Sequence, residues 1–215
     1  MIYFSKYITL FTFDYKSSTI FEMGLSTILL CGVWLAYSHS CLWIGSEMES
    51  GAAYTLFSKP VSRRDYLFGK YGAILLVVFI ALFFLSACLW WTLLLLKGWG
   101  GEKTILASVG LIALEVAILS SFSVIFAIFF SPVVHLLLLF LIFICGHIQF
   151  YLSRIWEGLG FLYILLPDLE LYNPLFLRES FLSWKYFIVV ACYAIFYIGF
   201  ILTIGWLIFR RKEFA

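Results

Sequence analysis

Charged side chains are scarce in this chain, and their scarcity excludes a soluble globular protein. Only 12 % of the 215 residues are charged, whereas 64 % are hydrophobic. The mean hydropathy is +1.06. A water-soluble fold of this length cannot hide so much apolar surface, so lipid must surround much of the chain. The formal net charge of +2 is too small to indicate a nucleic-acid partner. The composition therefore predicts a polytopic membrane protein.

Several patterns that carry chemistry are also missing. Gly69 and Lys70 look like the end of a P-loop, but Arg64 stands where its first Gly is needed and Tyr71 where Ser or Thr is needed. There is no G-x-S-x-G motif, and the sequence offers no argument for pairing a Ser with a His. We therefore expect no catalytic residue and no cofactor, and any ATP must be handled by another subunit. The cysteines stand singly in apolar runs and predict no disulfide framework: Cys31, Cys41, Cys88, Cys145 and Cys192.

Long apolar runs are present instead, and they predict an all-α helical bundle forming one transmembrane domain over residues 1–215. Crossing a bilayer takes about 20 apolar residues. The region 152–185 contains an apolar piece, GLGFLYILL, that is too short to cross, so we interpret it as a re-entrant or interfacial helix. The five predicted spans cover approximately residues 20–45, 71–96, 104–130, 133–151 and 186–209.

Basic residues at the span ends predict the orientation. With five spans, the loop at 46–70 and the C-terminus lie on the same side, and both are basic, so both are expected in the cytoplasm. The region 152–185 is then extracytoplasmic. This parity puts residue 1 outside, which is unusual without a signal sequence. We therefore expect either that one earlier span is missing from this chain or that residues 1–13 are its remnant.

The charged stretch at residues 46–70 predicts two helices separated by a proline. Small or apolar residues recur at four-residue steps, which indicates an amphipathic helix over residues 46–58. Pro60 disfavours helix at the residue before it, so this helix should stop there. Ser62 is placed as an N-cap, with Asp65 at the third helical position, and a second helix should run from there into the next span. A solvated loop with cytoplasmic positive charges is the equally supported alternative.

The same stretch contains a fairly specific motif between Glu47 and Gly72, E-x-x-x-G…L-x-S-K-P-V-S-R-x-x-Y-x-x-G-K-Y-x-G. This motif resembles the ABC-2 type transporter permeases, and it is closest to the branch that includes the copper-enzyme-maturation type of permease. Two weaker similarities are LPDLELYNP at 166–174 and FRRKEF at 209–214. Members of this family usually have six spans, one of them before the segment matching 20–45, which agrees with the parity expectation.

The resemblance implies a permease subunit of an exporter in the cytoplasmic (inner) membrane. Its partners would be a separate Walker-type ATP-binding subunit, a second permease copy or related permease, and membrane lipid. Gly51 and Gly69 would allow close approach, Pro60 would set the helix break, and Arg63 and Lys70 would meet acidic or carbonyl groups of the ATPase or lipid phosphate. The residues that would couple to the ATPase are Glu47, Gly51, Pro60, Ser62, Arg63, Tyr66, Gly69 and Lys70.

Glu115 is the candidate polar site inside a span, because an isolated charge in hydrocarbon is costly and marks function by default. A neutral or paired carboxyl near the outer interface is an equal alternative. His135 and His147 are twelve residues apart, which puts them about 120° apart on a helix, so they predict no metal site. Two other functions remain open: a membrane scaffold for an enzyme complex, and a secondary transporter, although no internal repeat supports the latter.

Overall fold

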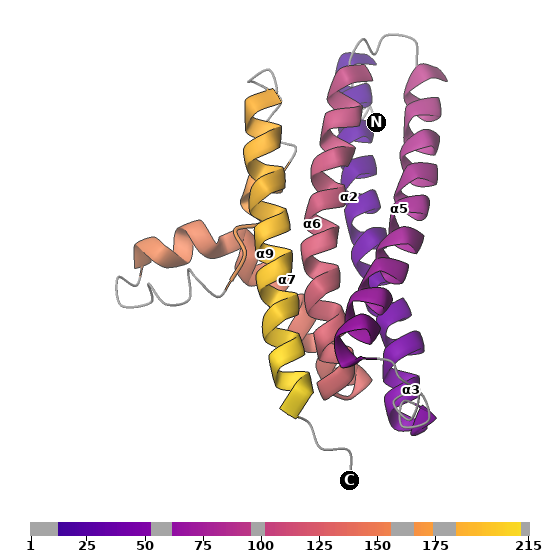
Figure 1. Cartoon of the computed structure of the whole chain (residues 1–215). Helices are drawn as coiled ribbons and strands as arrows, with labels where there is room; N and C mark the ends of the chain where they lie inside the picture. Colours follow the sequence, from indigo (N-terminus) through magenta and orange to yellow (C-terminus); the bar gives the residue numbers. More distant parts are fainter. Residues whose placement is uncertain (1–12, 53–61, 96–101, 156–165, 174–183, 212–215) are drawn as a thin grey trace, which may run out of the picture.

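The computed structural model describes residues 13–52, 62–95, 102–155, 166–173 and 184–211, and regular structure in these ranges is helical without strands (Figure 1). The predicted all-α class is confirmed. The first helix, α2 (Phe13–Ser40), continues through a π-helical turn at Cys41–Gly45 into α3 (Ser46–Glu49). The other long helices are α5 (Arg63–Leu95), α6 (Glu102–Phe129), α7 (Pro132–Ile155) and α9 (Trp184–Arg211), with a short 3₁₀ turn, η3, at Glu170–Tyr172.

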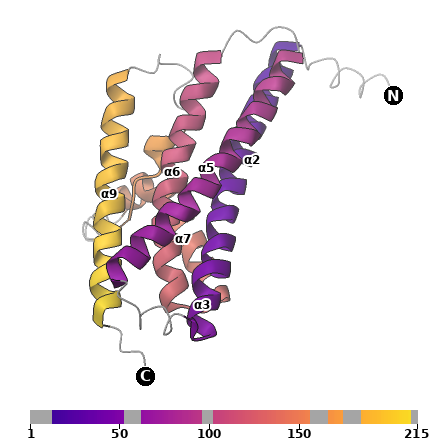
Figure 2. The same ribbon diagram turned by 45° about the vertical axis from the view of Figure 1, so that its right-hand side comes forward.

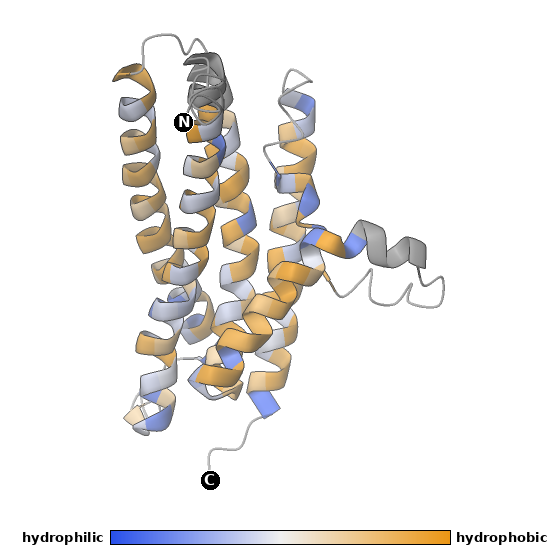
Figure 3. Ribbon diagram, turned by 180° about the vertical axis from the view of Figure 1, so that it is seen from behind, coloured by the Kyte–Doolittle hydropathy of each residue, from blue (hydrophilic) through white to orange (hydrophobic). Residues whose placement is uncertain are grey.

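Five stretches of helix in the described residues are long and apolar enough to cross a membrane, in agreement with the predicted spans. The second begins at Arg63, so the capped helix expected at Ser62 runs without interruption into the span. The third and fourth are separated by a tight turn because Pro132 takes the first position of α7, where its missing N–H costs nothing. The hydrophobic colour, orange, predominates along the helices, and hydrophilic blue appears at α3 and at the C-terminal end of α9 (Figure 3).

The helix α6 is the centre of the bundle. It contacts α2, α5, α7 and α9, and 78 % of its most apolar stretch is buried, against 28 % or less in the other four spans. Glycines at the helix crossings bring the backbones close. A Cβ at Gly32 would lie 2.9 Å from Val116 Cγ2, and one at Gly205 would lie 2.6 Å from Ile125 Cγ1. The other helices therefore present one face to α6 and the opposite face to lipid.

The helix α5 runs obliquely across the bundle. It starts beside the end of α9 and finishes beside the beginning of α2 (Figure 2). The ends of α3 and α9 and the start of α5 therefore lie together (Figure 1). We call this part of the molecule the charged end, defined by Glu47, Arg63 and Arg210. The prediction that the 46–70 loop and the C-terminal tail share one side is confirmed for the described residues.

The segment 166–173 enters the bundle beside α7 and α9 rather than lying on its surface. The N–H of Leu169 donates to the carbonyl of Gly146 on α7 at 3.2 Å, and the hydroxyl of Tyr172 donates to the carbonyl of Val190 on α9 at 3.1 Å. Leu169 and Tyr172 are fully buried. Irregular backbone is tolerated at membrane depth only where protein encloses it in this way. We call residues 166–173 the re-entrant segment after the interpretation of the 152–185 region, which stays a prediction; residues 156–165, with most of GLGFLYILL, lie outside the described residues.

The helix α7 differs from the other spans in its direction. It crosses the bundle obliquely, and its C-terminal end projects from the side (Figures 1 and 3). Gly146 near that end is required for the re-entrant segment, because a Cβ there would lie 2.6 Å from Leu169 Cγ and 3.0 Å from the carbonyl oxygen of Pro167. The oblique course of α7 and the absence of a side chain at Gly146 leave the space that 166–173 occupies.

Candidate functional site

The predicted helix at 46–58 is interrupted at residues 50–51; Ala52 is helical again, and residues 53–58 lie outside the described residues. The helix α3 stops at Glu49, and Gly51 adopts φ 73°, the left-handed conformation that commonly ends a helix. Most other residues would be strained at this φ, which gives Gly51 a role in the turn, while its expected role in close approach stays a prediction. Pro60, the expected break, lies outside the described residues. The amphipathic pattern was outweighed by a local terminating glycine.

The predicted cap at Ser62 is confirmed. The N–H of Asp65 donates to Ser62 Oγ at 3.1 Å, and this hydroxyl donates to Asp65 Oδ2 at 2.7 Å. Together these bonds satisfy a backbone donor in the first turn of α5 and put a carboxylate near the positive end of the helix dipole. The start of α5 is therefore fixed at Arg63, which sets the direction of every side chain that follows in this helix.

Glu47 joins α3 to α5 through two donors from the same face of α5. Lys70 Nζ lies 2.5 Å from Glu47 Oε1, and the hydroxyl of Tyr66 donates to Glu47 Oε2 at 2.8 Å. Lys70 also donates to the carbonyl of Trp43 at 3.2 Å. The four-residue step from Tyr66 to Lys70 puts both on one side of the helix. Both carboxylate oxygens of Glu47 therefore accept hydrogen bonds, and they hold the end of α3 against the start of α5.

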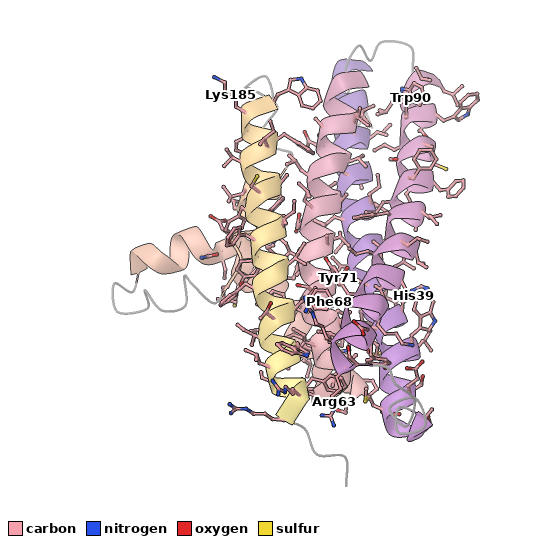
Figure 4. The ribbon with its side chains drawn as sticks, in the orientation of Figure 1. His39, Arg63, Phe68, Tyr71, Trp90 and Lys185 are labelled. Carbon is pink, nitrogen blue, oxygen red and sulfur yellow. The ribbon has the colours of Figure 1, made fainter. Side chains whose placement is uncertain are left out.

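Arg63 joins the start of α5 to the end of α9. Its Nη1 donates to the carbonyls of Phe209 at 2.8 Å and Arg210 at 3.1 Å, and its guanidinium lies 5.7 Å from the centre of the Phe209 ring. The last carbonyls of a helix lack partners within it and carry partial negative charge, so a cation is favourable there. Figure 4 shows Arg63 at the lower end of the bundle, beside the end of α9.

The partners expected for Arg63 and Lys70 on another subunit or on lipid are therefore not needed to satisfy these two cations, since the chain itself provides carbonyl and carboxylate groups. Gly69 differs from both. It is exposed, and a Cβ there would meet no atom within 4 Å. No close approach within the described chain requires a glycine at this position.

Glu115 lies near the middle of α6, fully enclosed. Its side chain is 1 % exposed, and neither carboxylate oxygen has a hydrogen bond within the described residues. The nearest basic group is His147 on α7, whose Nε2 lies 3.5 Å from Glu115 Oε1. Glu115 therefore faces a basic side chain of another helix, which agrees with the alternative of a paired carboxyl, while its depth in a membrane stays a prediction.

His147 is the residue that sequence reasoning missed, because it was compared only with His135. A usable signal existed in the hairpin formed by α6 and α7. Glu115 and His147 lie at equal distances along the chain from Ser131, in the turn between these helices. In an antiparallel helix pair, residues equally far from the turn lie at the same level. The hairpin alone therefore brings the two side chains to one depth.

A second polar cluster lies nearer the turn, and it contains a Ser–His contact for which the sequence offered no argument. Ser123 Oγ lies 2.9 Å from His135 Nε2 and 2.5 Å from Ser40 Oγ, and His135 Nδ1 lies 3.3 Å from Cys41 Sγ. Ser40, Ser123 and His135 are fully buried. No substrate reaches the serine, so we interpret the cluster as a packing network that fixes α2 against the hairpin beside its π-helical turn.

Metal chemistry finds no support in the part of the chain that the structure describes, where no three His, Cys, Asp or Glu side chains come close enough to hold an ion. Asp168, outside the spans, interacts electrostatically with His147. Burial raises the pKa of Asp168, although hydrogen bonds from the backbone of Glu170 and Leu171 oppose this. The pair of Glu115 and His147 can bind a proton or hold α6 against α7. In the described residues it offers no nucleophile and base that are open to a substrate.

Comparison with known proteins gives the family. The sequence profile described as ABC-2 family transporter protein matches residues 1–156, which include α2, α3, α5, α6 and α7. The chain belongs to this family. A search of curated proteins finds no match. As an ABC-2 family member, the chain is a multi-pass membrane transport component, and the residues predicted to couple it to an ATPase all lie within the matched part.

Proposed function

We propose that this ABC-2 family protein is the permease subunit of an exporter, driven by ATP hydrolysis on a separate subunit. The charged end would face the cytoplasm and receive the ATPase, in the cytoplasmic membrane. A second copy of this chain, or a related permease, would complete the transport path. The expectation of cytoplasmic placement rests on the excess of Lys and Arg near the span ends at this side, which include Arg63, Arg64, Arg210 and Arg211.

One observation supports the coupling role above the others: the connection between α3 and α5 is tied to the bundle at both of its bases. Glu47 binds Tyr66 and Lys70, and Arg63 binds the end of α9. A force applied to residues 50–62 by a docked ATPase would therefore pass to α2, α5 and α9 together. An untethered loop would absorb the same force by bending. The proposal thus assigns the motor to the partner and the lever to this chain.

Interior and exposed charges of the charged end would then have different tasks. Glu47 and Arg63 would transmit the movement, because their side chains join helices within the chain. Glu49 and Arg64, which are exposed on the same end, would be the groups available to the ATPase surface. This division refines the expectation that Arg63 and Lys70 contact the partner directly.

The experiment is affinity purification of the tagged chain from its native membrane, followed by identification of copurifying proteins and ATPase assays in nanodiscs. A Walker-type ATPase is expected, and it should copurify with wild type. Glu47→Ala and Arg63→Ala should retain less ATPase or lose the stimulation of ATP hydrolysis, whereas Glu49→Ala with Arg64→Ala should weaken binding alone. Unchanged binding and transport in the first two variants would sink the coupling assignment. A preparation without any ATPase would favour a scaffold or secondary transporter.

A further inference from the structure

Among the described residues, the pair of Glu115 and His147 is the buried ionisable site whose hydrogen bonding is incomplete. The two carboxylate oxygens of Glu115 accept no hydrogen bond within the described residues, while Nε2 of His147 lies 3.5 Å from one of them. A buried carboxylate without donors is costly, and near the middle of a membrane span there is no water to replace them. The site therefore lacks something that can bridge an oxygen and a nitrogen.

The other nitrogen of the imidazole identifies the missing group. Nδ1 of His147 lies 3.0 Å from the carbonyl oxygen of Phe143, one turn earlier in α7. A carbonyl only accepts, so Nδ1 must carry the hydrogen. In a neutral imidazole Nε2 is then a bare acceptor. An ionised Glu115 is also acceptor-only, and two acceptors facing each other at this distance form no bond. One proton placed between them completes the site.

We propose that Glu115 and His147 form a proton-binding site inside the bundle, and that the shared proton holds the re-entrant segment 166–173 in place. The proton count is the same whether the pair is carboxylate with imidazolium or carboxylic acid with imidazole. His147 is 24 % exposed, against 1 % for Glu115, so the imidazole is the more accessible member of the pair. This inference does not depend on ATP coupling or on the direction of transport.

The link to the segment comes from position in the chain. Gly146, the neighbour of His147, accepts the hydrogen bond from the N–H of Leu169. A bonded Glu115–His147 pair fixes this part of α7 against α6, and the segment packs on it. Loss of the proton would leave two acceptors facing each other, and α7 would then move away from α6. The amide of Leu169 therefore reports on the occupancy of the site.

Other titratable groups surround the pair and must be separated from it. Glu170 and Tyr172 in the re-entrant segment act electrostatically with Glu115, and Asp168 acts with His147. On α9, Tyr186 and Tyr193 interact with this same acidic segment. Glu115 is the member of this set that combines complete burial with the absence of any hydrogen-bond donor, which is why the proton is assigned to it and its partner.

The first test detects the proton in the full-length protein in nanodiscs, with histidine labelled with nitrogen-15. The His147 signals are assigned by their loss in His147→Asn. At neutral pH, wild type should show either an N–H at Nε2 or the infrared carbonyl band of a protonated carboxylic acid, and Glu115→Gln should lose that signal. Glu49→Gln, an exposed carboxylate, is the matched control and should retain it. Absence of both signals in wild type overturns the proposal. A signal that changes when choline replaces sodium in the buffer also overturns it, because the site would then hold sodium and not a proton.

The second test measures hydrogen exchange of the peptide that contains residues 166–173. In Glu115→Ala, exchange at the Leu169 amide should rise about tenfold, because one weak hydrogen bond no longer stabilises the docked segment. Glu115→Gln should keep protection without pH dependence, since its amide donates to Nε2 without a proton. In wild type, protection of the Leu169 amide should be lost as rising pH removes the proton, and this pH dependence should persist in Glu170→Gln. If it disappears there and persists in Glu115→Gln, the site is assigned to the wrong carboxylate.

Discussion

The charged end and the centre of the bundle each hold a Glu beside a basic residue, but the two pairs are satisfied in different ways. At the charged end, Lys70 lies 2.5 Å and the Tyr66 hydroxyl 2.8 Å from the oxygens of Glu47. Both side chains of the ion pair are partly exposed, at 22 % and 29 %. Two donors share the carboxylate charge there, so the hydrogen bonding of the pair is complete within the chain.

In the centre, Glu115 is fully buried and accepts no hydrogen bond from the described residues, and His147 Nε2 lies 3.5 Å away. The two pairs contain similar groups, so their residue types do not explain the difference. Access to water and to hydrogen-bond donors decides whether the carboxylate charge is satisfied. A partly exposed pair contributes a small and salt-sensitive stabilisation. A buried pair near the bilayer centre depends on one proton, and it controls the packing of the elements that enclose it.

Gly146→Ala should have the largest effect on this comparison, because it disrupts the central region without touching a charge. The added Cβ would lie 2.6 Å from Leu169 Cγ and 3.0 Å from the backbone oxygen of Pro167. We expect a loss of about 1–3 kcal/mol of unfolding free energy from overpacking. Gly199→Ala is the matched control, since its Cβ meets no atom within 4 Å. Denaturation in detergent measures both, and equal stabilities would contradict the assigned role of Gly146.

The sequence predicts local features better than the placement of the central pair. Ser62 and Asp65 are three residues apart and form their cap by local geometry alone, so the prediction held. The helix predicted at 46–58 is interrupted at Gly51, whose φ of 73° ends α3 in spite of the apolar period of this stretch. Local rules thus suffice where the interaction is local, provided that terminating residues are included.

The central pair required a different kind of information. Glu115 could be singled out as a charge within a span, but its partner is on another helix and is fixed by the register of the α6–α7 hairpin about Ser131. The re-entrant interpretation rests on the short apolar piece GLGFLYILL, whereas the docking of 166–173 on Gly146 depends on the oblique direction of α7. Helix crossing directions are set by packing among several elements and are not readable from one segment.

Arg63→Ala should have an intermediate effect at the charged end. The substitution removes donors to the carbonyls of Phe209 and Arg210, and we expect it to cost about 1 kcal/mol because the site is only partly buried. Hydrogen exchange should increase in the last turns of α9. Arg64→Ala is the control, since Arg64 is exposed and stacks on Phe68 of its own helix. If both variants raise exchange in α9 equally, the Arg63 contact does not hold the two helices together.

The smallest effect is expected for the pair formed by Glu47 and Lys70, and it is best measured by a double-mutant cycle. Glu47→Gln, Lys70→Met and the double variant should give a coupling energy of about 0.5–1 kcal/mol, in the range of partly exposed pairs. Tyr66 is unchanged in all four proteins. Its bond to residue 47 therefore cancels in the cycle, provided that the side-chain amide in Glu47→Gln accepts it as the carboxylate does. The coupling should fall as salt rises, because screening reaches exposed charges. A coupling that is insensitive to salt would mean that this pair is enclosed as Glu115 is, and the contrast between the two regions would fail.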